Sequence, residues 1–169
     1  MSQLPSDEIA SDFEGALEDL RSSEEYAISN LVVIARENIQ HAQAIARVVV
    51  NHIMKTRPEW KLPGMYVLDA ISKRVGSPYT VYFRPHLFKT FMDAYTTMNA
   101  ADRRAMDALL QTWKQPVPGT RDPTPVYPPE VVREIETPLM RWRTTVLQQS
   151  RRPNSPYGTR PTGDRKSVV

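Results

Sequence analysis

The chain has 169 residues, of which 40% are hydrophobic, so we expect one folded domain with a short tail. It contains no cysteine, which excludes a disulfide scaffold, a thiol nucleophile and a cysteine-ligated zinc site. No apolar run approaches the roughly 18 residues that a membrane span needs, and the polar, acidic residues 1–11 do not resemble a signal peptide.

Charge is unevenly distributed, although the net charge is only +3. Residues 1–25 carry eight acids and one base, and residues 26–149 carry 16 bases and 10 acids. Residues 150–169 add five bases and one acid. A moderately basic body favours an anionic partner through long-range attraction. It is not the dense Lys/Arg stripe that a duplex-binding protein presents.

Apolar residues recur at helical spacing along most of the chain. These stripes predict helices within residues 13–20, 28–39, 42–53, 62–75, 79–83, 87–98, 106–113 and 131–146. Strand-like alternation is not convincing anywhere. Amphipathic helices with short connections must pack on each other to bury their apolar stripes. We therefore predict an all-α superhelix or bundle of about eight helices.

Several residues are typical of helix ends. Ser22 precedes Glu25 by three residues, the spacing of a capping box. Gly76 suits the left-handed position after a helix, and Ser77 suits the cap of the next one. Asn99 is expected to cap the helix that follows it.

Prolines mark the C-terminal part of the chain. Residues 116–129 hold six prolines, which predict an extended connection. Pro138 lies inside the last apolar stripe, so a kink or break is expected there. We assign residues 1–149 to the domain, and residues 150–169 to a disordered basic tail rich in Ser, Pro and Arg.

A catalytic set is not apparent. The glycines are scattered and form no phosphate-binding loop. His41 and His52 are eleven residues apart and would share a helix face, but no carboxylate accompanies them at ligand spacing. Ordinary surface or boundary histidines are the favoured interpretation. We expect no enzymatic activity, no cofactor, no metal and no small-molecule substrate.

The predicted helix over residues 62–75 has a second stripe beside its apolar one. Tyr66, Asp69 and Lys73 follow each other at spacings of three and four. An aromatic surface, a hydrogen-bond acceptor and a cation together suit a turn-forming peptide with a tyrosine hydroxyl and a phosphate. The alternative is an internal Asp69–Lys73 salt bridge with no ligand. Arg74 could hold a phosphate bidentately or simply lie in solvent.

The segment Leu68–Tyr79, read with Leu110–Trp113 and Ala35–Ile39, resembles the CTD-interacting domain, or CID. The resemblance covers about residues 8–147. Within the family, it is greatest to the large subunit of fungal cleavage factor IA, which acts in pre-mRNA 3′-end processing and transcription termination.

The resemblance implies a right-handed superhelix of about eight helices, similar to VHS and ENTH domains. It implies that the second, fourth and seventh helices line a groove for the YSPTSPS repeats of the RNA polymerase II largest subunit, phosphorylated on the second-position serine. It further implies a nuclear protein that couples transcription to mRNA cleavage, polyadenylation and termination, with subunits of the processing complex as partners. The family's groove aspartate corresponds to Asp69.

The candidate peptide-binding residues come from three predicted helices. Relatives often carry Asn at position 74, and some carry an arginine near Lys114 to hold the phosphate. The second-helix candidates could equally be plain surface, and the two apolar ones are more often core, one of them expected as groove floor. The full set is Tyr26, Ser29, Asn30, Tyr66, Asp69, Lys73, Arg74, Met106, Leu110 and Lys114.

Two other functions are compatible with the sequence. A VHS/ENTH-like membrane-trafficking adaptor would need a basic amphipathic N-terminal helix or a basic lipid patch. Residues 1–25 carry a net charge of −7, which opposes anionic lipid and argues against a membrane partner. An RNA-binding helical module would exploit the basic body and tail. The sequence lacks an aromatic series of the RRM kind, so RNA is expected only as a weak secondary partner.

Overall fold

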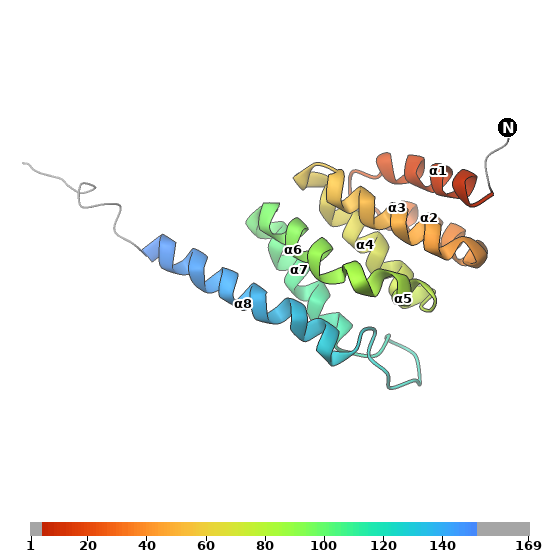
Figure 1. Cartoon of the computed structure of the whole chain (residues 1–169). Coiled ribbons are helices and arrows are strands. Elements are labelled where there is room, and N and C mark those ends of the chain that lie inside the picture. The colour runs from red at the N-terminus through yellow and green to blue at the C-terminus, as the bar shows by residue number, and fades with distance from the viewer. Residues whose placement is uncertain (1–4, 152–169) are drawn as a thin grey trace, which may run out of the picture. The chain divides into compact units, whose positions relative to one another are not determined.

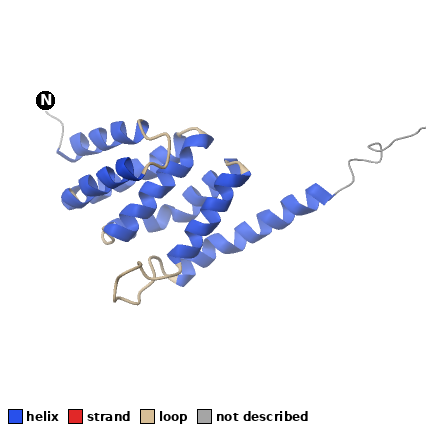
Figure 2. Cartoon of the chain, turned by 180° about the vertical axis from the view of Figure 1, so that it is seen from behind, coloured by secondary structure: helices blue, strands red, loops and turns tan. Residues whose placement is uncertain are grey.

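The computed structural model describes residues 5–151, and every regular element in that range is helical (Figures 1 and 2). The elements are α1 (Pro5–Glu18), α2 (Glu25–Glu37), η1 (Ile39–His41), α3 (Ala42–Lys55), α4 (Pro58–Arg74), α5 (Tyr79–Phe83), η2 (Arg84–His86), α6 (Leu87–Thr97), α7 (Ala100–Trp113) and α8 (Pro129–Arg151). The prediction of an all-α chain of about eight helices is confirmed.

The predicted tail lies outside the described residues from position 152 on. None of the described helices is both long enough and apolar enough to cross a membrane.

The chain forms two compact units, Met1–Ile135 and Glu136–Val169. In the first unit α3 is the central helix, because it packs against α1, α4, α5 and α6. Its sequence explains this position. Ile45, Val49 and Ile53 are fully buried, and α3 contains no acidic residue that would require solvent. The described part of the second unit is the continuation of α8.

The helix ends confirm two of the predicted caps and contradict two. Asn99 accepts a 2.8 Å hydrogen bond from the Asp102 amide, and Gly76 has a φ of 79°. The Ser22 capping box is wrong, since α2 starts after Glu24 without a side-chain cap. The Ser77 cap is also wrong, because the residue before α5 is Pro78, again without a side-chain cap.

Helix α4 begins at Pro58, four residues earlier than predicted, and continues through Pro63. Pro58 is tolerated because the first helical residue has no intrahelical use for its N–H. Lys61 then explains why the extra turn forms. Its buried ammonium donates to the carbonyl oxygens of Ile53 and Met54, at 2.6 and 2.9 Å. The first turns of α4 thereby satisfy the carbonyl end of α3, where a cation is favoured.

The sequence predicted a kink or a break at Pro138, and helix α8 runs through this residue without a break. A proline inside a helix removes one backbone hydrogen bond, to the carbonyl four residues earlier. That residue is Glu134, which is exposed. The proline therefore costs the helix less than it would in a buried segment.

The two histidines expected on one helix face lie on different elements. His41 ends η1 and bonds to the Ser6 hydroxyl at 2.7 Å, whereas His52 lies on α3. His52 is 4% exposed, so the surface or boundary interpretation is wrong for it. Gly64 on α4 lies against it, since a Cβ there would come 3.4 Å from His52 Cδ2 and 2.9 Å from Ile53 Cγ1. The close approach of α3 and α4 thus buries the imidazole.

Candidate peptide-binding site

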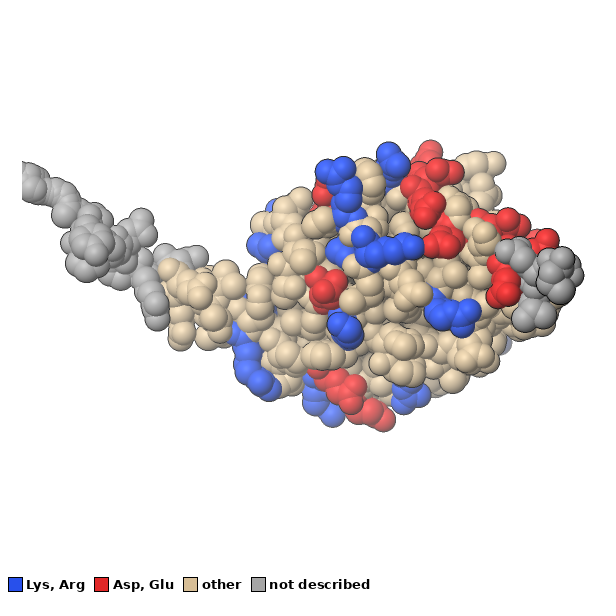
Figure 3. Space-filling view, turned by 45° about the horizontal axis from the view of Figure 1, so that its top comes forward, with Lys and Arg blue, Asp and Glu red and all other residues tan. Residues whose placement is uncertain are grey.

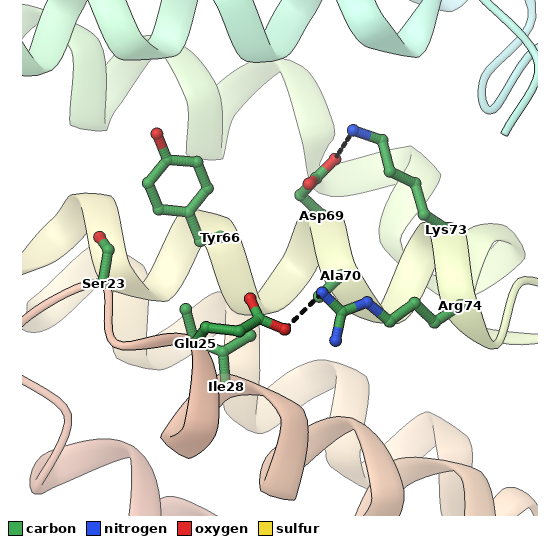
Figure 4. A pocket seen from close by; sticks show the side chains of 8 residues that line it. All are labelled: Ser23, Glu25, Ile28, Tyr66, Asp69, Ala70, Lys73 and Arg74. Carbon is green, nitrogen blue, oxygen red and sulfur yellow. Dashed lines mark hydrogen bonds and ion pairs between the residues drawn. The ribbon is translucent and has the colours of Figure 1, made fainter. Parts of the chain in front are cut away.

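A pocket of about 500 Å³ opens between the start of α2 and one face of α4 (Figure 4). Its lining residues are Ser23, Glu25, Ile28, Tyr66, Asp69, Ala70, Lys73 and Arg74. Figure 4 shows the Tyr66, Asp69 and Lys73 side chains on one side of α4, while Arg74 points toward α2. The structure therefore brings together the four candidates that the sequence placed on this helix.

Asp69 is fixed by two donors that converge on one oxygen. The indole Nε1 of Trp113 donates to Asp69 Oδ1 at 2.9 Å, and Lys73 Nζ lies 2.9 Å from the same atom. The side chains of Asp69 and Lys73 are only 13% and 19% exposed. The Asp69–Lys73 salt bridge that the sequence offered as the alternative is therefore present, and it is partly shielded from water. No hydrogen bond from the described residues reaches Oδ2.

Lys73 connects α4 to the end of α7. Its ammonium donates to Thr112 Oγ1 at 2.8 Å, and that hydroxyl donates to the Leu109 carbonyl at 2.6 Å. The cation therefore bridges the Asp69 carboxylate and the last turn of α7. This bridging holds the ammonium in a defined place beside the pocket.

Tyr127, which the sequence analysis missed, anchors the proline-rich connection behind Asp69. Its amide donates to the Trp113 carbonyl at 3.2 Å. Its ring packs edge-on against the Trp113 ring, with 5.3 Å between the two ring centroids. Its hydroxyl lies 2.7 Å from Ser72 Oγ. Since Ser72 donates its one hydroxyl proton to the Leu68 carbonyl, Tyr127 is the donor. Burial raises the pKa of Tyr127 well above 10, which keeps that proton in place.

Arg74 lies in a triad with two α2 residues. Its guanidinium donates to Ser29 Oγ at 3.0 Å and to Glu25 Oε2 at 2.9 Å. The Ser29 hydroxyl also donates to Glu25 Oε2, at 2.7 Å. The Ser29 hydrogen bond, followed by the Arg74 hydrogen bond and charge, lowers the pKa of Glu25. Arg74 therefore does not simply lie in solvent, one of the two alternatives left open by the sequence.

The other candidates do not line this pocket. Tyr26 is 74% exposed and Asn30 is exposed, both on α2. Met106 and Leu110 on α7 are 0% and 1% exposed, so they belong to the core. Lys114 caps the C-terminal end of α7 and is exposed.

Charge on the molecular surface is mixed. Figure 3 shows basic and acidic side chains interspersed over one face, with acids gathered at the end where the chain begins. A face of this kind carries no broad single-sign field of the sort that binds nucleic acid.

Comparison with known proteins defines the class. Residues 11–117 match the CID domain. The structure superposes on the crystal structure of the RPR of Pcf11 with a TM-score of 0.71 and 30% sequence identity. The match covers 78% of this chain and 98% of that one. The chain belongs to the CID domain family.

Its relatives include much longer proteins. An uncharacterised protein of Schizosaccharomyces pombe is 43% identical over 137 residues, which are 81% of this chain and 22% of that protein. Protein PCF11 of Saccharomyces cerevisiae is 35% identical over 64% of this chain and 17% of its own length. The polyadenylation and cleavage factor homolog 11 of Caenorhabditis elegans is 28% identical over 62% and 13%. The chain thus spans about a fifth of these relatives or less.

Proposed function

We propose that the chain is a non-catalytic adaptor that binds the YSPTSPS repeats of the RNA polymerase II largest subunit when their second-position serine is phosphorylated. Membership of the CID domain family and likeness to PCF11 support this proposal. In the same proposal the protein acts in the nucleus, within the machinery that cleaves and polyadenylates mRNA and terminates transcription. Other subunits of that machinery are its expected partners.

The arrangement of Tyr66, Asp69 and Lys73 carries the proposal. An aromatic ring, a positioned carboxylate and a cation lie along one side of α4 at the mouth of a pocket. Asp69 keeps Oδ2 for a ligand donor, while Trp113 and Lys73 hold its other oxygen. A tyrosine hydroxyl or a peptide N–H of the repeat would donate to Oδ2, and the Tyr66 ring would cover apolar atoms of a proline.

Affinity for one repeat should be modest. The repeat peptide is disordered before it binds, so its ordering entropy offsets much of the contact energy. Many repeats on one polymerase tail would raise the effective affinity through local concentration. We expect a dissociation constant for a two-repeat peptide between about 1 μM and 1 mM.

Fluorescence anisotropy with labelled two-repeat peptides tests the proposal. Peptides phosphorylated on the second-position serine, unphosphorylated peptides and scrambled peptides of equal charge are titrated with the full chain. The phosphorylated peptide is expected to bind several-fold more tightly than the unphosphorylated one, and the scrambled one not at all. Equal, very weak binding of all three would refute the proposed function.

A further inference from the structure

A second hollow lies between α3 and the α5–η2 segment, and it shares no residue with the pocket beside α4. Its volume is about 400 Å³, enough to receive one or two side chains. The lining residues are Gln43, Ala46, Arg47, Asn51, Val81, Tyr82, Pro85 and His86.

One wall of the hollow is a polar row on α3. Gln43, Arg47 and Asn51 follow at intervals of four, so they lie above each other on one helix face. Within residues 5–149, none of these side chains makes a hydrogen bond or an ion pair with another described residue. The two amides and the guanidinium are therefore available to an acceptor-rich ligand.

The opposite wall combines the apolar residues Val81 and Pro85 with Tyr82 and His86. Val81 on α5 is 58% exposed, and Pro85 follows it in the same wall. Phe88, the next residue at helical spacing, is 45% exposed. Val81, Pro85 and Phe88 thus form an apolar series in sequence from α5 to the first turn of α6. Exposed apolar groups beside a hollow are typical of an interaction surface.

The hollow is built from two segments that contain no acidic residue. Neither residues 38–58 nor residues 70–92 include an Asp or a Glu, although together they carry seven Lys and Arg residues. Arg47 lies in the wall, and Arg84 and Lys89 lie next in sequence to Pro85 and Phe88. No carboxylate lines the hollow, so its local charge is positive in a chain whose net charge is only +3.

We propose that this hollow docks a short acidic segment of a partner protein, with an aliphatic or aromatic residue of that segment against Val81 and Pro85. The guanidinium of Arg47 would pair bidentately with a carboxylate of the segment. Gln43 and Asn51 would bond to its backbone. An apolar anchor beside a charged pair is the usual composition of a binding hot spot.

Two competing occupants fit the surface less well. RNA affinity grows with the number of neutralised phosphates, and Arg47 is the one guanidinium in the described lining of the hollow. A second copy of the chain would present the same acid-free surface in a two-fold contact, so like charges would oppose each other. A partner segment with acids and an apolar anchor meets both walls at once.

The experiment is an NMR titration of the full, ¹⁵N-labelled chain with a defined probe. The probe is a peptide of about twelve residues, made of Asp and Glu with one Leu and one Phe four positions apart. One control peptide has Ser in place of Leu and Phe, and another has Lys in place of every acid. An oligouridine of equal length tests RNA. We expect saturable shifts at residues 43–51 and 81–86 with the acidic apolar probe, and much weaker ones with the three controls.

Two variants test the two walls, and a third is the matched control. Arg47→Glu should weaken the acidic probe about tenfold, and Val81→Ser should weaken it about threefold through lost apolar contact. Arg133→Glu reverses another exposed cation, on α8, and should leave the affinity within about twofold. None of the three should change binding of a phosphorylated YSPTSPS peptide.

The proposal is overturned by any of five results. They are no saturation by about 1 mM probe, shifts confined to Tyr66 and Asp69, equal binding of the Lys-substituted peptide, tighter binding of oligouridine at residues 43–51, and concentration-dependent shifts there without any probe. The last would identify a second copy as the occupant.

Discussion

The indole N–H of Trp113 donates to Asp69 Oδ1 at 2.9 Å, so a fully buried aromatic of α7 holds the carboxylate of the candidate site on α4. The hydrogen bond spans 44 residues of sequence. It makes the position of the carboxylate depend on how α7 and the connection after it are packed.

Replacement of Asp69 by alanine should weaken binding of the phosphorylated two-repeat peptide by about 1–3 kcal/mol, the usual size for a hydrogen bond to a charged group. The substitution removes the acceptor and also leaves Lys73 and the Trp113 indole without their partner. Fluorescence anisotropy measures the loss.

Two further variants separate acceptor chemistry from structure in that experiment. Trp113→Phe keeps an aromatic ring in the core but removes the donor that holds Asp69, so we expect a smaller loss of affinity. Asp12→Ala removes an exposed acid on α1 and should have no effect. An unchanged affinity of Asp69→Ala, with an intact helical circular dichroism spectrum, would remove Asp69 from the site.

Replacement of Glu25 by glutamine should strengthen binding of the phosphorylated peptide about three- to tenfold, while the unphosphorylated peptide changes by less than twofold. The Glu25 carboxylate pairs with Arg74 at 2.9 Å, and an incoming phosphate must compete with it. The neutral amide releases the guanidinium for the phosphate.

The ratio of the two affinities is the readout for Glu25→Gln. Glu24→Gln is the matched control, because it neutralises the neighbouring exposed acid, for which no contact with Arg74 is found in the described residues. Equal gains for both peptides would mean that Arg74 does not meet the phosphate.

Replacement of Tyr127 by phenylalanine should lower the free energy of unfolding by about 1 kcal/mol or somewhat more. The change removes the hydrogen bond to Ser72 but keeps the ring against Trp113. Urea denaturation measures the loss. Amide hydrogen exchange should also quicken at Val126 and Tyr127, whose amides donate to the carbonyl oxygens of Gln115 and Trp113. Tyr26→Phe, at an exposed hydroxyl, should change neither quantity.

Stability should fall as the pH drops below about 6.5, because of His52. Burial, followed by the charge of Lys55, lowers the pKa of His52 below 6.5, its ordinary value, while Lys61 acts in the same direction and Glu14 and Glu18 oppose it. The unfolded chain therefore binds this proton at a higher pH than the folded chain. The free energy of unfolding from this group is constant above about pH 6.5, and it decreases as the pH falls toward the lower folded-state pKa, by at most about 1.4 kcal/mol per pH unit.

Urea denaturation between about pH 5 and pH 7.5 measures that slope. His86→Ala, at an exposed histidine, should retain it, whereas His52→Gln should reduce it. An equal slope in His52→Gln would assign the pH dependence to other groups.

The helices were predictable because their signals are local. Apolar residues at a spacing of three and four mark the stripes of α3 and α7, and Asn99 caps α7 through a residue only three positions away. The same periodicity predicted that one side of α4 carries Tyr66, Asp69 and Lys73.

The features that the sequence did not predict depend on residues far apart in the chain. Lys61 adds a turn to α4 because it reaches the end of a different helix, which no spacing within α4 reveals.

The site residues missed by sequence reasoning are of the same kind. Glu25 and Arg74 are 49 positions apart, and only the packing of α2 on α4 brings them together. Tyr127 and Ser72 are 55 positions apart. The one available signal for Tyr127 was a lone aromatic in a proline-rich stretch, where an apolar side chain has no helical stripe to join.

The Arg74 triad restricts which chemical mimics of a phosphorylated ligand can succeed. Its guanidinium already faces a carboxylate, so a phosphomimetic Asp or Glu in a peptide would exchange one monoanion for another and gain little. A phosphate brings close to two negative charges and three acceptor oxygens, enough to displace Glu25. Repeat peptides with Asp or Glu in place of serine should therefore bind this domain no more tightly than the unmodified peptide. Only phosphorylation of the serine should raise the affinity.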